Sequence, residues 1–96
     1  MPTQPKDYSQ LKALLESQEK FPTTYLHKFI GKNTVAFHGG VSGLEKRFAT
    51  LTLELSRESV GGKHVAKTYR FGASSADEII ELLKATDQVP DLLMVL

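Results

Sequence analysis

The feature that most constrains the fold is a nearly regular alternation of apolar and polar residues from Ala49 to Arg57. Successive side chains of a strand point to opposite faces of a sheet, so this pattern predicts a strand with one buried face. A glycine-containing loop follows at 58–63, and residues 64–72 alternate again, which together predict a β-hairpin. The residues predicted to face inward are Ala49, Leu51, Leu53, Leu55, Val65, Tyr69 and Phe71. Lys67 falls on the inward set, which indicates either a snorkelling side chain or a β-bulge.

Two further strands are predicted at 23–30 and at 92–96. Lysine is rarely buried, so we expect Lys28 to lie on the open face of the sheet. Leu26 and Ile30 share its side of the first strand and are expected on the same face. The residues expected to face the core from these two strands are Tyr25, His27, Phe29, Leu92, Met94 and Leu96. The outward residues of the last strand are then Leu93 and Val95.

The chain begins with a proline-containing tail and a short predicted helix. Asp7 and Gln10 have the spacing of a helix start, and Phe21-Pro22 ends the segment because proline disfavours helix in the residue before it. The apolar face of this helix contains Tyr8, Leu11, Leu14 and Leu15.

Two more helices are predicted at 33–48 and after the capping box Ser75–Glu78. Asn33 or Thr34 can cap the first of them. Its glycine pair, Gly39-Gly40, predicts a distortion there, since glycine is unfavourable inside a helix. The two apolar stripes are Phe37, Val41, Leu44 and Phe48, and then Ile79, Leu82, Leu83 and Thr86.

From residue 21 onward the order of elements is β-α-β-β-α-β. This order predicts an α+β fold, the ferredoxin-like two-layer sandwich, with an antiparallel sheet in the order 4-1-3-2 and both helices on one face. Residues 1–20 then form an N-terminal tail and an extra helix, and residues 21–96 form the domain.

Four segments carry a resemblance to a known family: Phe21-Pro22, Phe29-Ile30-Gly31, the glycine hairpin and Met94-Val95-Leu96. Over residues 21–96 the chain resembles the YbeD-like family of small bacterial proteins of unknown function. The resemblance implies an ACT-like fold, similar to small-molecule-sensing modules, and brings no catalytic residues with it. This sequence departs from the family at His27, usually aromatic, at Lys67, usually aliphatic, and at Leu93, usually basic.

Composition excludes several classes of protein. The 12 basic and 11 acidic residues leave a net charge of +1, which disfavours a polybasic nucleic-acid or membrane-surface role. The chain has no cysteine, so disulfides, thiol nucleophiles and Zn–Cys sites are excluded. The three histidines lack metal-ligand spacing, so we expect neither a metal nor a cofactor. No apolar run is long enough for a membrane span, and we expect a cytoplasmic protein.

The loop Gly31-Lys32-Asn33-Thr34 lies between a strand and a helix. It does not match a phosphate loop, because Leu26 and Asn33 stand at positions that require glycine and Ser/Thr. Backbone N–H groups at a helix start can nevertheless hold an anion, so these four residues are candidate ligands for a small carboxylate metabolite. The alternative is an ordinary tight turn with an asparagine cap.

We expect a protein that is not an enzyme. Acylphosphatases share the fold class but need an arginine in this loop, where Lys32 cannot form the same bidentate fork. RNA-recognition modules stack bases on strand aromatics, but here Tyr25, Phe29, Tyr69 and Phe71 are all predicted to face inward. RNA binding, with Arg57, Lys63 and Arg70 as phosphate contacts, is therefore a third hypothesis.

Leu26, Ile30, Leu93 and Val95 are predicted to form one apolar patch on the open face of the sheet. We expect this patch to be covered by a second copy, a protein partner or the N-terminal helix. The sequence thus predicts a non-enzymatic binding or regulatory module that acts through a small metabolite or a protein partner. The alternative is a protein–protein adaptor that uses the open sheet face or a sheet edge.

Overall fold

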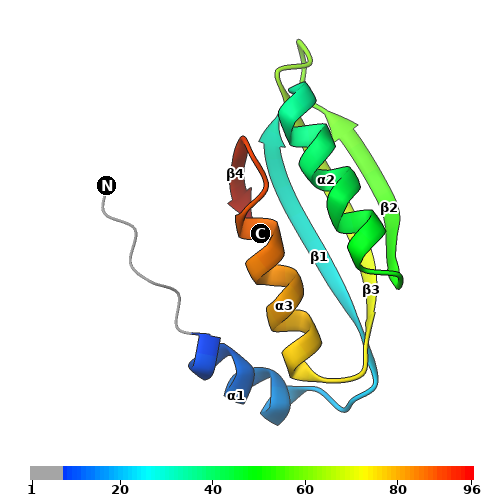
Figure 1. The fold of residues 1–96 in the computed structure, drawn as a ribbon, viewed down its shortest axis with the longest axis vertical. Helices are drawn as coiled ribbons and strands as arrows, with labels where there is room; N and C mark the ends of the chain where they lie inside the picture. Colours follow the sequence, from blue (N-terminus) through cyan, green and yellow to red (C-terminus); the bar gives the residue numbers. More distant parts are fainter. Residues whose placement is uncertain (1–7) are drawn as a thin grey trace.

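A four-stranded antiparallel sheet forms one layer of the protein, and two helices lie side by side on one face of it (Figure 1). The computed structural model describes residues 8–96. In chain order the elements are α1 (Tyr8–Gln18), β1 (Thr23–Lys32), α2 (Val35–Arg47), β2 (Leu51–Glu58), β3 (His64–Ala73), α3 (Ala76–Asp87) and β4 (Leu92–Val95). The expected α+β class is confirmed, with each predicted helix and strand present within these residues. The tail and Asp7 lie outside the described residues.

The strand order is β2-β3-β1-β4, so the hairpin strand β2 and the short β4 form the two edges. Read from the β4 edge, this is the sequence of neighbours that the order of elements predicts. The central strands β1 and β3 pair in unbroken register from Thr23 opposite Ala73 to Lys32 opposite His64.

The hydrophobic core lies between the sheet and helices α2 and α3. His27 and Phe29 are fully buried, whereas Leu26 and Lys28 are exposed, which confirms the orientation of β1 that Lys28 predicts. The Phe29 and Tyr69 rings stack with centroids 5.8 Å apart. The helices contribute the buried residues Phe37, Val41, Leu44, Ile79, Ile80, Leu82 and Leu83.

The alternation of β2 breaks in the middle of the strand. Leu53 lies opposite Tyr69, but Leu55 lies opposite Thr68, so Glu54 is an extra residue in the ladder. Opposite residues share a face, and a one-residue bulge sends every later side chain to the other face. The prediction that Leu55 faces inward is therefore wrong, and Leu55 lies on the open face with Thr68. The irregularity lies in β2 and not at Lys67, which pairs in register with Phe29.

A second irregularity reverses part of β4. Ile30 pairs with Met94 and Phe29 with Val95, but Gly31 pairs with Leu92, so Leu93 is the extra residue. Val95 therefore packs against the core, and Met94 lies on the open face beside Ile30. This corrects three predictions, since strict alternation assigned Met94 and Leu96 to the core and Val95 to the outer patch, whereas Leu96 is 64% exposed and its N–H bonds to Lys28 O on the open-face strand β1.

The expected distortion of α2 is absent, because Val35–Arg47 is one continuous helix. Gly40 instead permits a close approach: a Cβ there would lie 2.8 Å from Pro90 Cδ and 2.9 Å from Val89 Cγ1. A Cβ on Gly39 would meet nothing within 4 Å. The two glycines of the pair thus have different roles, and only Gly40 is required by packing.

Helix α1 lies against α3 in the helical layer (Figure 1). The Tyr8 hydroxyl donates to Asp87 Oδ2 at 2.7 Å, and Lys12 Nζ lies 3.0 Å from Asp77 Oδ1. The prediction that the N-terminal helix covers the open face, one of three alternatives, is therefore wrong. None of the helices within residues 8–96 has the length and apolar character needed to cross a membrane.

Candidate functional site

The loop at residues 31–34 connects β1 to α2 and was expected to present free amides. The structure shows that its amides are occupied: Lys32 N donates to Asp91 O, Asn33 N to Lys63 O, and Thr34 N to Lys32 O, each at 2.9 Å. Gly31 is buried, and a Cβ there would overlap the Phe37 ring. The premise of the carboxylate site is therefore wrong for these three amides.

The side chains of this loop join it to two neighbouring turns. Asn33 Nδ2 donates to Glu58 Oε1 at 2.7 Å and to Gly62 O at 2.8 Å, which ties the loop to the hairpin. The Thr34 hydroxyl donates to Asp91 Oδ2 at 2.7 Å, and its oxygen caps α2 by accepting from Phe37 N at 3.1 Å. The Asp91 carboxylate beside the helix start opposes a bound anion by charge repulsion. The loop functions as a structural junction in this geometry.

The open face of the sheet carries a set of exposed or partly exposed apolar side chains, which we call the open-face patch. The open-face patch consists of Leu26, Ile30, Leu55, Leu93, Met94 and Leu96. Leu26 is 62% exposed and Met94 is 50% exposed, and these values are high for large apolar residues. Within residues 8–96, no helix covers this face, because all three helices lie in the layer on its other side (Figure 1).

A hollow of about 430 Å³ lies within the open-face patch. Its apolar lining is formed by Ile30, Ala66, Leu93 and Met94, from the three adjacent strands β3, β1 and β4. Its polar rim is formed by Arg57, Glu58, Ser59 and His64 at the hairpin end. The hollow can accommodate one large apolar side chain or a small amphipathic molecule.

The strand register places cations beside this apolar surface. Arg57 shares a cross-strand row with Ala66, Ile30 and Met94, whereas Lys28 lies opposite Thr68, which is also opposite Leu55. Neither Arg57 nor Lys28 forms an ion pair with another residue of the 8–96 segment. Arg70, by contrast, pairs with Glu54 at 2.5 Å. Lys32, on the same side of β1 as Lys28, also forms no ion pair within these residues, so three cations of the open face are available to a ligand.

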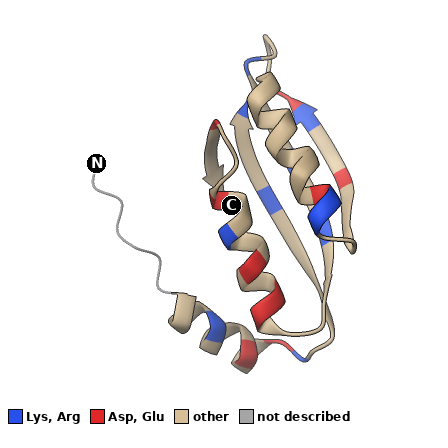
Figure 2. Ribbon diagram, viewed as in Figure 1, with Lys and Arg blue, Asp and Glu red and all other residues tan. Residues whose placement is uncertain are grey.

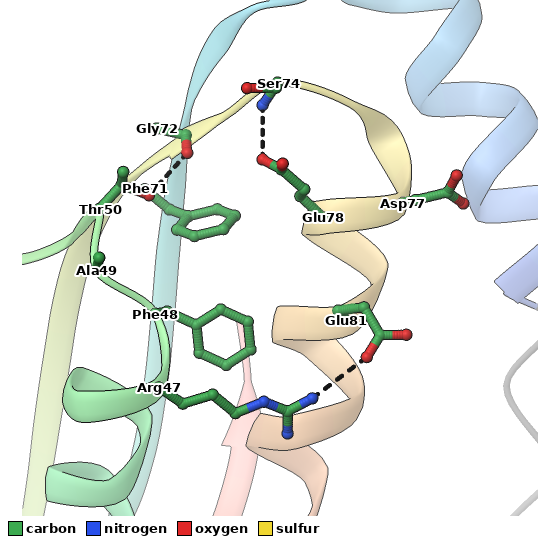
Figure 3. Close-up of a pocket in the computed structure, with 10 residues that line it drawn as sticks. All are labelled: Arg47, Phe48, Ala49, Thr50, Phe71, Gly72, Ser74, Asp77, Glu78 and Glu81. Carbon is green, nitrogen blue, oxygen red and sulfur yellow. Dashed lines mark hydrogen bonds and ion pairs between the residues drawn. The ribbon is translucent and has the colours of Figure 1, made fainter.

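A second hollow of about 490 Å³ lies between the end of α2, the start of β2 and the start of α3 (Figure 3). Phe48 and Phe71 meet edge to face inside it, with ring centroids 5.8 Å apart. Its charged groups are already engaged: Glu81 accepts from Arg47 at 3.3 Å and Glu78 from Ser74 N at 2.7 Å. Asp77 points away from the hollow, and its carboxylate pairs with Lys12 of α1 (Figure 3). A ligand here would have to break contacts within the protein.

His27 is a fully buried titratable group of the core. The Thr86 hydroxyl donates to Leu82 O at 2.7 Å, so its oxygen accepts the Nε2 proton of His27 at 2.9 Å. Burial lowers the pKa of His27 to about 4, against a smaller opposing effect of the Asp87 charge. His27 Nδ1 has no partner within the described residues. The ring is neutral at pH 7 and sealed from solvent, which suits packing and not catalysis.

The other histidines lie apart from His27. His38 Nε2 contacts Asn33 Oδ1 at 2.5 Å beside the α2 start, and His64 lies on the rim of the open-face hollow. Residues 8–96 contain no group of three or more His, Cys, Asp or Glu side chains arranged to hold a metal ion.

These features define a small α+β domain with an apolar sheet face that carries unpaired cations. Residues 16–96 match the family described as "Protein of unknown function (DUF493)". The chain therefore belongs to that family, the YbeD-like family of small bacterial proteins, as the sequence resemblance indicates. No curated protein and no solved structure matched the chain.

Sequence reasoning found only part of the open-face patch. Leu26, Ile30 and Leu93 were predicted, but Leu55, Met94 and Leu96 were assigned to the core. Alternation carries no mark of a β-bulge, so no signal in the sequence separated Leu55 from Leu53. Arg57 was noted only as a phosphate contact, and its place opposite Ala66, in the same row as Ile30, follows from the bulged register.

Proposed function

We propose that this protein is a non-enzymatic binding module, ferredoxin-like and ACT-like in fold, that recruits a protein partner on the open face of its sheet. The observation that carries the proposal is the open-face patch, whose side chains come from β1, β2 and the β4 end of the chain, and which no described helix covers. Large contiguous apolar surfaces mark interaction sites in soluble proteins. The expected location remains the cytoplasm, on the basis of sequence alone.

A macromolecular partner fits this surface better than a small metabolite does. The loop that was to hold a carboxylate uses its amides internally. The apolar side chains also extend beyond the hollow to Leu26, Leu55 and Leu96, which a molecule seated in the hollow would leave exposed. A small ligand in the hollow alone is therefore the second candidate.

RNA binding has weaker support. The aromatic side chains that would stack on bases are Phe29, Tyr69 and Phe71, which are buried, and Tyr25, which is half-buried on the same side. All four face the helices and not the open face. Phosphate contacts alone leave the apolar surface unexplained.

The proposal is tested by capturing partners from lysate of the source cells with wild-type protein and two variants. Leu26→Arg places a charge on the open-face patch, whereas Leu14→Arg makes the same change on α1, at a half-exposed position. We expect one set of proteins to be retained by the wild type and by Leu14→Arg, and to be lost with Leu26→Arg. Equal retention by all three proteins would contradict the use of the open face.

A further inference from the structure

The charges of this protein are divided unequally between its two layers (Figure 2). Helices α1, α2 and α3 contain six acidic and four basic residues. The strands contain five basic residues, Lys28, Lys32, Arg57, Lys67 and Arg70, and only two acidic ones. The chain is nearly neutral as a whole, yet its sheet layer is positively charged and its helical layer is negatively charged.

Both acidic residues of the strands are already engaged. Glu54 pairs with Arg70, and Glu58 accepts a hydrogen bond from Asn33 Nδ2 at 2.7 Å. Lys28 and Arg57 have no acidic partner within residues 8–96. A hydrogen bond from a neutral amide leaves the charge of Glu58 in place, but five basic residues against two acidic ones still make the strands positively charged, and the unpaired cations Lys28 and Arg57 lie beside the open-face patch.

We infer that the partner presents an amphipathic acidic segment to the open face, with apolar side chains against the open-face patch and carboxylates at Lys28 and Arg57. This inference rests on the proposed function and names the chemistry of its partner. One large apolar side chain would enter the hollow between Ile30, Ala66 and Met94, beside Arg57 on its rim. Carboxylates on either side of that apolar side chain form ion pairs with Lys28 and Arg57.

The same charges disfavour a second copy as the occupant. Two open faces packed together would bring the unpaired Lys28 and Arg57 of each copy into one interface in which basic residues of the described strands outnumber Glu54 and Glu58. Like charges in a desolvated interface oppose association. An acidic partner avoids this repulsion, and its carboxylates attract Lys28 and Arg57.

The inference is tested with three synthetic 16-residue peptides that share leucines at helical spacing. Their other positions are all Glu, all Gln or all Lys. Each peptide is titrated into the ¹⁵N-labelled full chain, and amide shifts are followed by NMR. We expect the Glu peptide to shift the amides of Ile30, Ala66 and Met94, with a dissociation constant roughly threefold to tenfold below that of the Gln peptide. The Lys peptide should leave these amides unmoved.

Two variants assign the effect to the named cations. Arg57→Gln and Lys28→Gln should each raise the dissociation constant of the Glu peptide towards that of the Gln peptide. The control Lys46→Gln, on α2, should leave it unchanged, and added salt should weaken the Glu peptide selectively.

The outcomes separate this inference from the proposed function. Equal affinity for the Glu and Gln peptides at the open face overturns the acidic partner and leaves the open face as a binding surface. Shifts confined to the helices contradict both. No shift with the Glu peptide at millimolar concentration also overturns the inference, and the capture experiment with Leu26→Arg then decides the proposed function by itself.

Discussion

Leu55 lies opposite Thr68 in the β2–β3 ladder, one position away from the partner that unbroken alternation would give it. The bulge at Glu54 turns Leu55 from the helix side to the open face, where Lys28 is the next residue across the sheet from Thr68. A leucine with no core role thus joins the open-face patch in the same cross-strand row as the unpaired Lys28. This local irregularity extends the candidate interface to the β2 edge.

Leu55→Thr tests this placement. Because Leu55 is exposed on the open face, the substitution should change the free energy of unfolding by less than about 0.5 kcal/mol. A residue packed in the core would lose several times more. Urea denaturation measures the difference, and a loss of about 2 kcal/mol or more would contradict the bulged register.

The glycine pair of α2 gives a matched prediction. Gly39→Ala should stabilise the protein by about 0.5–1 kcal/mol, because alanine is the better helix former and its Cβ meets nothing. Gly40→Ala should destabilise it by about 1–3 kcal/mol, because its Cβ overlaps the Val89–Pro90 turn. Urea denaturation of the two variants gives both values. A change of the same sign in both would indicate that the pair acts through helix propensity alone.

His27 makes stability depend on pH. Its pKa is about 4 in the folded protein and 6.5 in the unfolded chain, so between these values the unfolded chain binds more protons. The contribution of neutral His27 to the free energy of unfolding is fully present above pH 6.5 and is lost as the pH falls from 6.5 through 4. The full contribution is about 3 kcal/mol. His27→Phe should remove this part of the pH dependence, which denaturation at pH 7, 5.5 and 4 would show. An unchanged pH profile in the variant would contradict a neutral buried ring.

Asn33→Ala tests the loop at residues 31–34 as a structural junction. The substitution removes two hydrogen bonds to the hairpin and should lower the free energy of unfolding by about 1–2 kcal/mol.

In the wild type, an NMR titration with common amino acids and organic acids should leave the amide signals of Lys32, Asn33 and Thr34 unmoved. Saturable shifts of these three amides would restore the carboxylate site that the occupied amides argue against.

Most of the fold could be predicted from residue patterns, because each element carries its own signal. Lys28 oriented β1 correctly, since a charged side chain resists burial and the strand is regular. The site was harder to predict, because its composition depends on two one-residue bulges, at Glu54 and at Leu93. A bulge is stabilised by the fit of neighbouring strands, and that fit is a tertiary property which leaves no local pattern. The docking of α1 on α3 is also a tertiary property without a local pattern, since it depends on the hydrogen bond from Tyr8 to Asp87, which is distant in the sequence.

The central claim is that the open face, and not the helical layer, meets a protein partner. The most direct measurement places a photo-reactive p-benzoylphenylalanine at Met94, on the open-face patch, or at Leu14, on α1, in the full chain within source cells. Both side chains are 50% exposed, so their general reactivity is matched. The account predicts a discrete cross-linked species from position 94 that is weakened when Arg57→Gln is added, and none from position 14. Cross-linking from position 14 with none from position 94 would contradict it.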